Sequence, residues 1–164
     1  MSETAPHVAA PVTSQPDEPY ASWGLRVAAS LVDAGIQLPF VVFNLITASV
    51  ATDPDSGPVT QILMLVLGLV SAVASLVFSI WNLYVRQGRC GASLGKQCFG
   101  LLLISGVDAR PIGGVSVFVR SLMHALDALP LGLGYLWPLV DRRRQTFADK
   151  VMNTVVLRLP DVRF

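Results

Sequence analysis

Two long apolar stretches in the first half of the sequence constrain the fold more than any other feature. Residues 25–51 and residues 61–85 each exceed the about 20 residues that a helix needs to cross the hydrocarbon core of a bilayer. The second stretch carries no charged side chain between Thr60 and Arg86. The short connection between them contains two aspartates, two prolines and a glycine, which is typical of a turn. The pattern therefore predicts two transmembrane helices.

The low share of charged residues agrees with a lipid environment. Charged residues make up 14% of the 164 residues and hydrophobic residues 52%, whereas a soluble domain carries about 25% charged residues. The formal net charge of +1 gives no indication of nucleic-acid binding. Residues 1–19 contain neither an apolar run nor a Lys or Arg. We therefore expect a disordered tail without a cleavable signal peptide, followed by one membrane domain over residues 20–164.

A third apolar segment, residues 114–140, is long enough to span but is interrupted by Pro130, Gly132, Gly134 and Pro138. Lys and Arg follow the second and third segments and are missing from the first connection. The positive-inside rule places both basic stretches, and both termini, in the cytoplasm. The third segment is then expected to form a re-entrant or interfacial helical hairpin, with an amphipathic helix over 115–129 and a return helix over 131–140. A true third span is the alternative.

Two short apolar runs, residues 99–104 and 154–159, have the composition of strands and are expected to pair as a small cytoplasmic β-ribbon. Ser93 is expected to cap a short helix that precedes the first run. Cys90 and Cys98 fit neither a redox nor a zinc motif and are expected to be reduced thiols. The predicted fold is thus an all-α membrane protein with two transmembrane helices, a helical hairpin and a short ribbon.

The polar side chains of the apolar segments lie on narrow faces. Advancing about 100° per residue from Arg26 places Asp33, Gln37 and Asn44 within about 20° of one line. The third segment gathers its polar residues in a similar arc, which holds Arg120, His124 and Asp127. A softer stripe on the second segment is formed by Gly68, Ser71, Ser75, Ser79 and Asn82. Lipid cannot form hydrogen bonds with these groups, so the three faces are expected to turn inward and meet.

Three interpretations of the charged groups stay open. They can be structural pairs that fix the helix register, a proton or ion relay through Asp33, His124 and Asp127, or a docking site for a charge of a partner subunit. Asp33 lies about 10 Å beyond Arg26 along the helix axis, and its expected partners are Arg26 and Arg120. No catalytic triad spacing, metal motif or pair of catalytic carboxylates stands out. We therefore expect no enzymatic activity and no metal or cofactor.

The order and spacing of several short motifs resemble the RDD family over residues 20–159. The similarity begins with Tyr20-Ala-Ser-Trp, Arg26 and Asp33, and passes through Asp108, Arg110-Pro111 and Arg120. Its central motif consists of Gly91, Ser93, Gly95, Lys96 and Gly100, followed by Leu101. It ends with Asp141-Arg-Arg-Arg-Gln-Thr146, Asp149 and Thr154-Val-Val156. Two departures from the family pattern are Gln97-Cys98-Phe99, where basic residues are usual, and the absence of an arginine in residues 101–104.

The resemblance implies a small multi-span protein of the bacterial cytoplasmic membrane, for which a transport role is commonly suggested. The arginine and the two aspartates that name the family map to Arg26, Asp141 and Asp149. Both aspartates are expected to pair with Arg26 or Arg120 near the inner surface. Transport of a proton, an ion or a small solute is the first functional expectation, and a non-catalytic accessory subunit of a larger membrane complex is the alternative. The expected partners are the bilayer, anionic headgroups facing residues 142–144, and further copies of the chain or foreign subunits.

Overall fold

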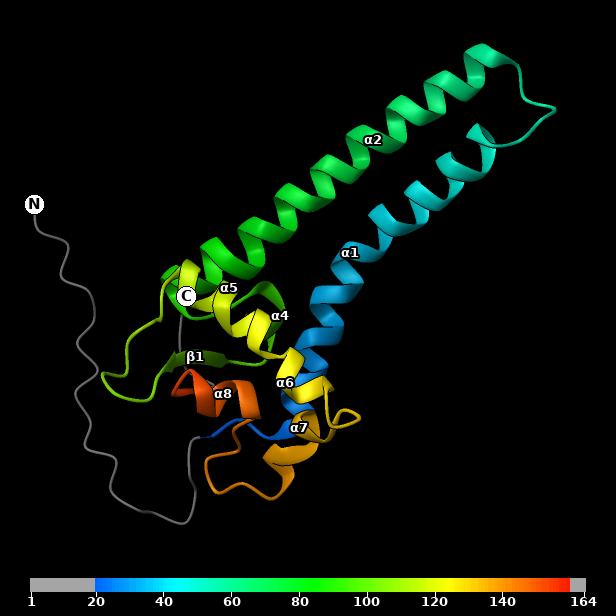
Figure 1. The fold of residues 1–164 in the computed structure, drawn as a ribbon. Helices are drawn as coiled ribbons and strands as arrows, with labels where there is room; N and C mark the ends of the chain where they lie inside the picture. The colour runs from blue at the N-terminus through cyan, green and yellow to red at the C-terminus, as the bar shows by residue number, and fades with distance from the viewer. Residues whose placement is uncertain (1–19, 160–164) are drawn as a thin grey trace, which may run out of the picture.

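Two long antiparallel helices project from a smaller layer of short elements (Figure 1). The computed structural model describes residues 20–159. Helix α1 spans Trp23–Ala51. Ser22 caps its N-terminus, because the Ser22 hydroxyl accepts a hydrogen bond from Leu25 N. Helix α2 spans Pro58–Ile80 and starts with a proline, which suits the first helical position. Within the described residues, α1 and the continuous helical stretch Pro58–Cys90 are the two helices long and apolar enough to cross a membrane.

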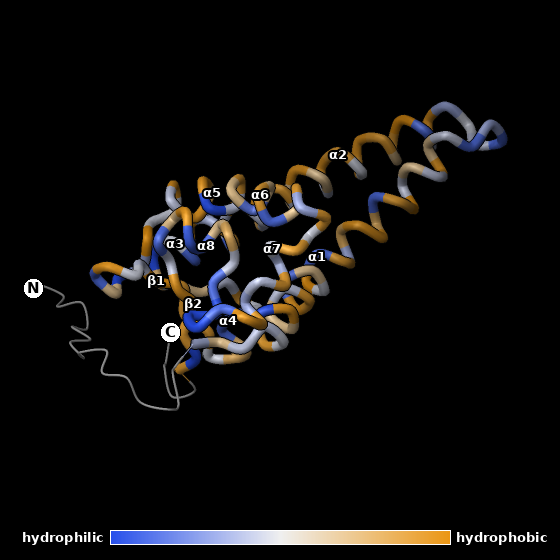
Figure 2. The backbone as a smooth tube through the Cα atoms, turned by 60° about the horizontal axis from the view of Figure 1, so that its bottom comes forward, coloured by the Kyte–Doolittle hydropathy of each residue, from blue (hydrophilic) through white to orange (hydrophobic). Residues whose placement is uncertain are grey.

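The outer surface of the helix pair is apolar. No residue of α2 is buried, and α1 buries only Ala29 and Thr47. Apolar positions dominate both helices, with single polar turns on α1, and polar positions gather at the far loop (Figure 2). Such a surface matches hydrocarbon, which agrees with the two predicted membrane helices.

Helix α2 continues through a π-helical stretch, η1 (Trp81–Arg86), into α3 (Gln87–Cys90). Gly91 ends α3 with a φ of 77°, a left-handed conformation that favours glycine. The next helix, α4 (Leu94–Cys98), begins at Ser93, whose side chain accepts a hydrogen bond from Lys96 N. The predicted Ser93 cap is confirmed.

The predicted ribbon is confirmed as a two-stranded antiparallel sheet of β1 (Leu101–Ser105) and β2 (Thr154–Arg158), in which Leu103 pairs with Val156. Ala21 extends the sheet locally, because its N–H donates to Val156 O at 2.8 Å. A small core forms where the ribbon meets α1 and α5 (Gly114–Met123). Its fully buried members are Ala21, Ala29, Leu101, Leu103, Val117 and Val156.

The third apolar segment is broken into short pieces. Helix α5 is followed by α6 (Ala125–Ala128), α7 (Leu133–Leu136) and the 3-10 turn η2 (Trp137–Leu139), and α8 (Phe147–Val151) comes after the segment. The predicted continuous helix over 115–129 is therefore interrupted at His124, and the predicted return helix over 131–140 consists of two short turns. None of these pieces has the length of a span. The predicted tail, residues 1–19, lies outside the described residues.

Candidate functional site

The polar stripes of α1 and α2 face each other and form hydrogen bonds along the helix pair. Gln37 Nε2 donates to Ser79 Oγ and to Ser75 O, and Ser75 Oγ donates back to Gln37 Oε1. Two turns further along, Asn44 Nδ2 donates to Ser71 Oγ at 3.0 Å. The predicted inward orientation of these two stripes is therefore present. We call this line of side chains, which runs from Asp33 and Asn82 to Thr47 and Gly68, the polar seam.

The far end of the polar seam depends on a glycine. A Cβ atom at Gly68 would lie 2.9 Å from Thr47 Oγ1 and 3.8 Å from Asn44 Oδ1. Thr47 is 3% exposed, although most of its neighbours on α1 face outward. The missing side chain at Gly68 thus lets α1 and α2 approach closely, as small residues do between membrane helices.

At the other end of the polar seam, Asp33 is held by neutral donors. Its carboxylate accepts hydrogen bonds from Asn82 Nδ2 at 2.9 Å, Ser93 Oγ at 2.6 Å and Gly95 N at 2.8 Å. The expected pairing of Asp33 with Arg26 or Arg120 is wrong, because within residues 20–159 no cation lies within salt-bridge distance of it. Asp33 lies 18 residues before the end of α1, which is about 27 Å along the axis. This distance is close to the thickness of a hydrocarbon core, about 30 Å.

The central glycine-lysine motif docks on α1 next to Asp33. A Cβ atom at Gly95 would lie 2.0 Å from Ala29 O, so only glycine permits this approach of α4 to α1. Asn82 completes the contact, since its Oδ1 accepts a hydrogen bond from Leu94 N. Gly91 and Gly100 hold left-handed turns on either side of α4. The motif therefore orients the donors that hold the Asp33 carboxylate.

A second network surrounds the fully buried carboxylate of Asp149. Arg26 Nη1 lies 2.8 Å from Asp149 Oδ2, and Arg120 Nη2 lies 2.6 Å from Asp149 Oδ1. Thr154 Oγ1 also donates to this carboxylate, which accepts Thr146 N in the capping box of α8 as well. Asp149 thus joins the first turn of α1 to α5, α8 and β2.

Electrostatics favour the ionised form of Asp149. Burial alone would raise the pKa of this carboxyl, but Arg120 and Arg26 outweigh burial and lower the pKa to about 2. Asp149 therefore stays charged throughout the physiological pH range.

Asp127 and His124 form a third group. Asp127 is fully buried, and its Oδ2 lies 2.5 Å from His124 Nδ1. Its Oδ1 accepts hydrogen bonds from Phe147 N at 2.8 Å and Ala148 N at 3.3 Å, which anchors the start of α8. Burial and then Arg120 lower the pKa of His124, although Asp127 opposes the shift. The His124 ring also stacks on Tyr135 at a centroid distance of 5.6 Å.

Asp141 does not pair with Arg26 or Arg120, so this part of the family-based expectation is wrong. Its Oδ1 lies 2.6 Å from Lys150 Nζ, and its Oδ2 accepts hydrogen bonds from Arg143 N and Gln145 N. Lys150 in turn lies over the Trp137 ring. Asp141 therefore folds the turn before α8 and has no contact with the arginine pair.

Lys96 lies between the two larger networks. Its ammonium group donates to Gln87 Oε1. Burial lowers the pKa of Lys96 to about 7, Arg120 adds to this effect, and Asp33 and Asp149 oppose it. The lowered pKa of Lys96 thus lies close to neutral pH, next to the Asp33 end of the polar seam.

The predicted cluster is therefore divided among three groups, and His124 and Asp127 pair with each other in one of them. Arg26 and Arg120 meet at Asp149, whereas Asp33, Gln37 and Asn44 belong to the polar seam. Gln87 gave no sequence signal, and Thr154 and Gly95 belong to family motifs that did not indicate which carboxylate they would contact. In the part of the chain that the structure describes, no group of three or more His, Cys, Asp or Glu side chains is placed to hold a metal ion, and both cysteines are free thiols.

Comparison with known proteins identifies the family. The chain is 36% identical over 162 residues to the "Proline-rich antigen homolog" of Mycobacterium tuberculosis strain ATCC 25618 / H37Rv, which covers 88% of this chain and 65% of the relative. It is also 36% identical to the "Proline-rich antigen" of Mycobacterium leprae strain TN, over 89% of this chain and 64% of the relative. The chain thus spans less than two thirds of the length of these curated relatives, and no solved structure matches it. The model of the RDD family matches residues 20–153, and the chain belongs to the RDD family.

Proposed function

We propose that this protein is a membrane transport subunit in which the polar seam forms one wall of a path for a proton, an ion or a small solute. The observation that carries the proposal is the continuity of the seam. Hydrogen-bonded polar groups recur from Asp33 and Asn82, through Gln37, to Asn44 and Ser71, on helices whose outer faces are apolar. Polar groups inside membrane segments are costly and often mark substrate pathways.

The path would be completed by more than one chain. Two helices cannot enclose a pore, because each contacts the other on a single face. We therefore propose that the transport unit is a homo-oligomer, and that it acts without a catalytic step.

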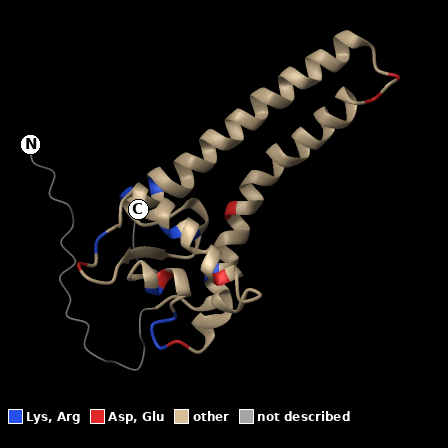
Figure 3. Ribbon diagram, viewed as in Figure 1, with Lys and Arg blue, Asp and Glu red and all other residues tan. Residues whose placement is uncertain are grey.

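The distribution of charge supports an orientation for this unit. Lys and Arg gather around the short elements at one end of the hairpin, while the charged residues of the loop at the other end, Asp53 and Asp55, are both acidic (Figure 3). By the positive-inside rule, the end that carries α4 to α8 faces the cytoplasm of a bacterial cell, together with both termini. A topology reporter fused after Phe164 should therefore read cytoplasmic, and a periplasmic reading would contradict this orientation.

The broken third segment is proposed to lie in the membrane interface as a short hairpin. Its apolar side chains remain exposed in the isolated chain, among them Val115, Phe118, Leu122, Leu129 and Leu131. Tyr135 and Trp137 follow in the chain and are also exposed. Tyr and Trp side chains favour the headgroup region of a membrane. Residues 142–144 would then face anionic headgroups.

Vesicle flux tests the transport proposal. The purified protein is reconstituted and assayed for proton, K⁺, Na⁺ and neutral-solute flux against empty vesicles. Gln37→Leu removes the bonds to Ser75 and Ser79 and is expected to abolish the flux, whereas Leu38→Ala, on an exposed side chain outside the polar seam, is expected to leave it unchanged. Asp33→Asn is assayed beside them, and unchanged flux would remove Asp33 from the path. Flux equal to that of empty vesicles throughout the panel would reject the proposal.

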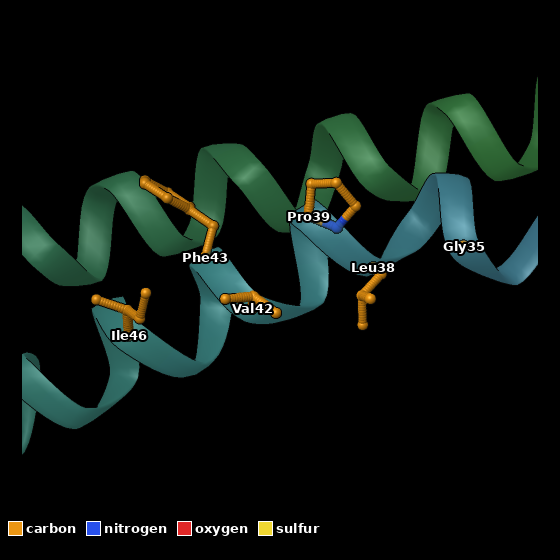
Figure 4. Close-up of a pocket in the computed structure, with 6 residues that line it drawn as sticks. All are labelled: Gly35, Leu38, Pro39, Val42, Phe43 and Ile46. Carbon is orange, nitrogen blue, oxygen red and sulfur yellow. The ribbon is translucent and has the colours of Figure 1, made fainter.

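An accessory role in a larger complex is the second candidate, and a groove on the opposite face of α1 favours it. The groove is lined by residues of α1 alone, among them Gly35, Leu38, Pro39 and Val42 (Figure 4). These residues lie about 120° to 220° around the helix from the polar stripe. Pro39 cannot donate to Gly35 O, and its ring interrupts the regular helix surface there. Mass measurement in mild detergent separates the candidates, because co-purifying foreign subunits favour the accessory role and a homo-oligomer favours transport.

A further inference from the structure

A second groove, distinct from the one in Figure 4, follows one flank of the helix pair. It has a volume of about 460 Å³ and is lined by both helices. From α1 it receives Val41, Asn44 and Leu45, and from α2 it receives Ala72, Ser75, Leu76 and Ser79. These spacings of three and four residues are those by which a helix presents one face to a neighbouring helix. We call this surface the flank groove.

The floor of the flank groove is polar although its rim is apolar. Asn44 Nδ2 already donates to Phe40 O and Ser71 Oγ, but within residues 20–159 no donor forms a hydrogen bond with Asn44 Oδ1. Asn44 lies seven residues before the end of α1, about 10 Å along the axis, and therefore inside the hydrocarbon region. In the hydrocarbon region no water supplies the hydrogen bond that this amide oxygen lacks.

We propose that the flank groove is the interface between two copies of this chain, which pack groove to groove as a four-helix bundle. A two-fold axis along the membrane normal places identical residues of the two copies at the same depth. The Asn44 amides and the Ser75 hydroxyls of both copies then meet near the axis, while Val41, Leu45 and Leu76 pack around them. Donors and acceptors can exchange across the axis, because amide and hydroxyl groups carry both.

A second copy meets the requirements of the flank groove better than an unrelated helix does. An unrelated helix would need a polar group at the depth of Asn44 and apolar groups on either side of it. The chain itself already has that pattern, and a two-fold interface uses the same patch on both subunits. Hydrogen-bonding residues such as Asn are recognised contacts between membrane helices.

The role of this pairing in transport rests on the proposed transport function. The groove floor is the open side of the polar seam at Asn44, Ser75 and Ser79. Two seams that face each other would supply the second wall that a single chain lacks. The pairing itself can hold or fail independently of any flux.

Cysteine cross-linking in native membranes tests the pairing. In a background with Cys90→Ser and Cys98→Ser, Leu45→Cys and Ala72→Cys place a thiol in the flank groove, and Leu38→Cys places one in the opposite groove. Oxidation is expected to give a disulfide-linked dimer from positions 45 and 72 and only monomer from position 38. A dimer from position 38 alone, or monomer from all three positions, would overturn the proposal.

The contribution of Asn44 is measured in the Ala72→Cys background. Asn44→Leu is expected to lower the dimerisation constant about three- to tenfold, the range for one hydrogen-bonding contact between membrane helices. Undiminished cross-linking in that variant would remove Asn44 from the interface.

Flux measured on the same samples separates the proposed transport function from the proposed dimer interface. Cross-linked protein without flux rejects transport alone, and flux without cross-linking at positions 45 and 72 rejects this interface alone.

Discussion

The Arg26 guanidinium and the Asp149 carboxylate lie 2.8 Å apart although 123 positions separate them in the chain. Arg120 contacts the same carboxylate from α5. One fully buried side chain thus links the start of the membrane hairpin to the C-terminal elements. Folding of the hairpin and folding of the short elements are consequently coupled.

Replacing Asp149 with Asn is expected to destabilise the protein strongly. The change leaves two buried guanidinium groups without a counter-charge, which typically costs about 3–5 kcal/mol. The pKa of Asp149 is lowered from 3.8 to about 2, so its ion pairs contribute fully above about pH 4 and are lost as the pH falls toward 2. Thermal unfolding in mild detergent at pH 7 therefore captures the whole effect.

The exposed loop residue Asp55 provides the control, and Asp55→Asn should leave the unfolding temperature unchanged. Exchanging the charges in Arg26→Asp/Asp149→Arg should fail to restore stability, because the arginine introduced at position 149 would face Arg120. Wild-type stability of Asp149→Asn would show that the arginine pair does not need this carboxylate.

The contact of α4 with α1 is expected to fail in Gly95→Ala. The new Cβ would lie 2.0 Å from Ala29 O and 2.8 Å from Asp33 Cγ, so α4 must move away and Asp33 loses its donors from Ser93 and Gly95. Faster proteolysis within residues 91–100 would report this release. Gly24→Ala is the matched control, since no atom lies within 4 Å of the added group. It should be neutral or stabilise α1 by about 0.5–1 kcal/mol.

The sequence predicts the parts of this fold that repeat a pattern. Length and hydropathy locate the two long helices, and the 100° rotation per residue predicts that Gln37 and Asn44 face the serines of α2. The strand-like composition of the apolar runs 99–104 and 154–159 predicts a ribbon, and the observed pairing joins residues 101–105 to 154–158. The family pattern, and not the spacing alone, directs attention to Asp149.

The partners of Asp33 and Asp127 could not be predicted in the same way. Two of the decisive donors to Asp127 are the N–H groups of Phe147 and Ala148, and one donor to Asp33 is the N–H of Gly95. Every residue except proline carries such a group, so its position appears only once the chain is folded. Charge alone therefore predicts arginine partners for Asp33, whereas neutral donors bind its carboxylate in the folded chain.

Two substitutions of Asp127 should differ in a diagnostic way. Asp127→Ala leaves the N–H groups of Phe147 and Ala148 without an acceptor, and each unpaired buried donor costs about 1–3 kcal/mol. Asp127→Asn keeps an oxygen for them, and its amide can donate to His124 Nδ1 when the imidazole is neutral. The unfolding temperature of the Asn variant should therefore lie well above that of the Ala variant. Equal losses would show that the negative charge beside His124 matters more than the anchoring of α8.

Lys96 should make the protein more stable as the pH rises above neutrality. Its pKa is lowered from 10.5 to about 7 in the folded protein, mainly by burial. Between these values the unfolded chain binds a proton that the folded protein does not, so the free energy of unfolding increases with pH over this window.

Lys96→Met removes this contribution, and the variant should show a flatter dependence of unfolding temperature on pH between about 7 and 10. The comparison uses the difference in slope, because the mutation also deprives Gln87 of its hydrogen bond and shifts all values together. Parallel curves for the two proteins would show that the pKa of Lys96 is not lowered in the folded protein.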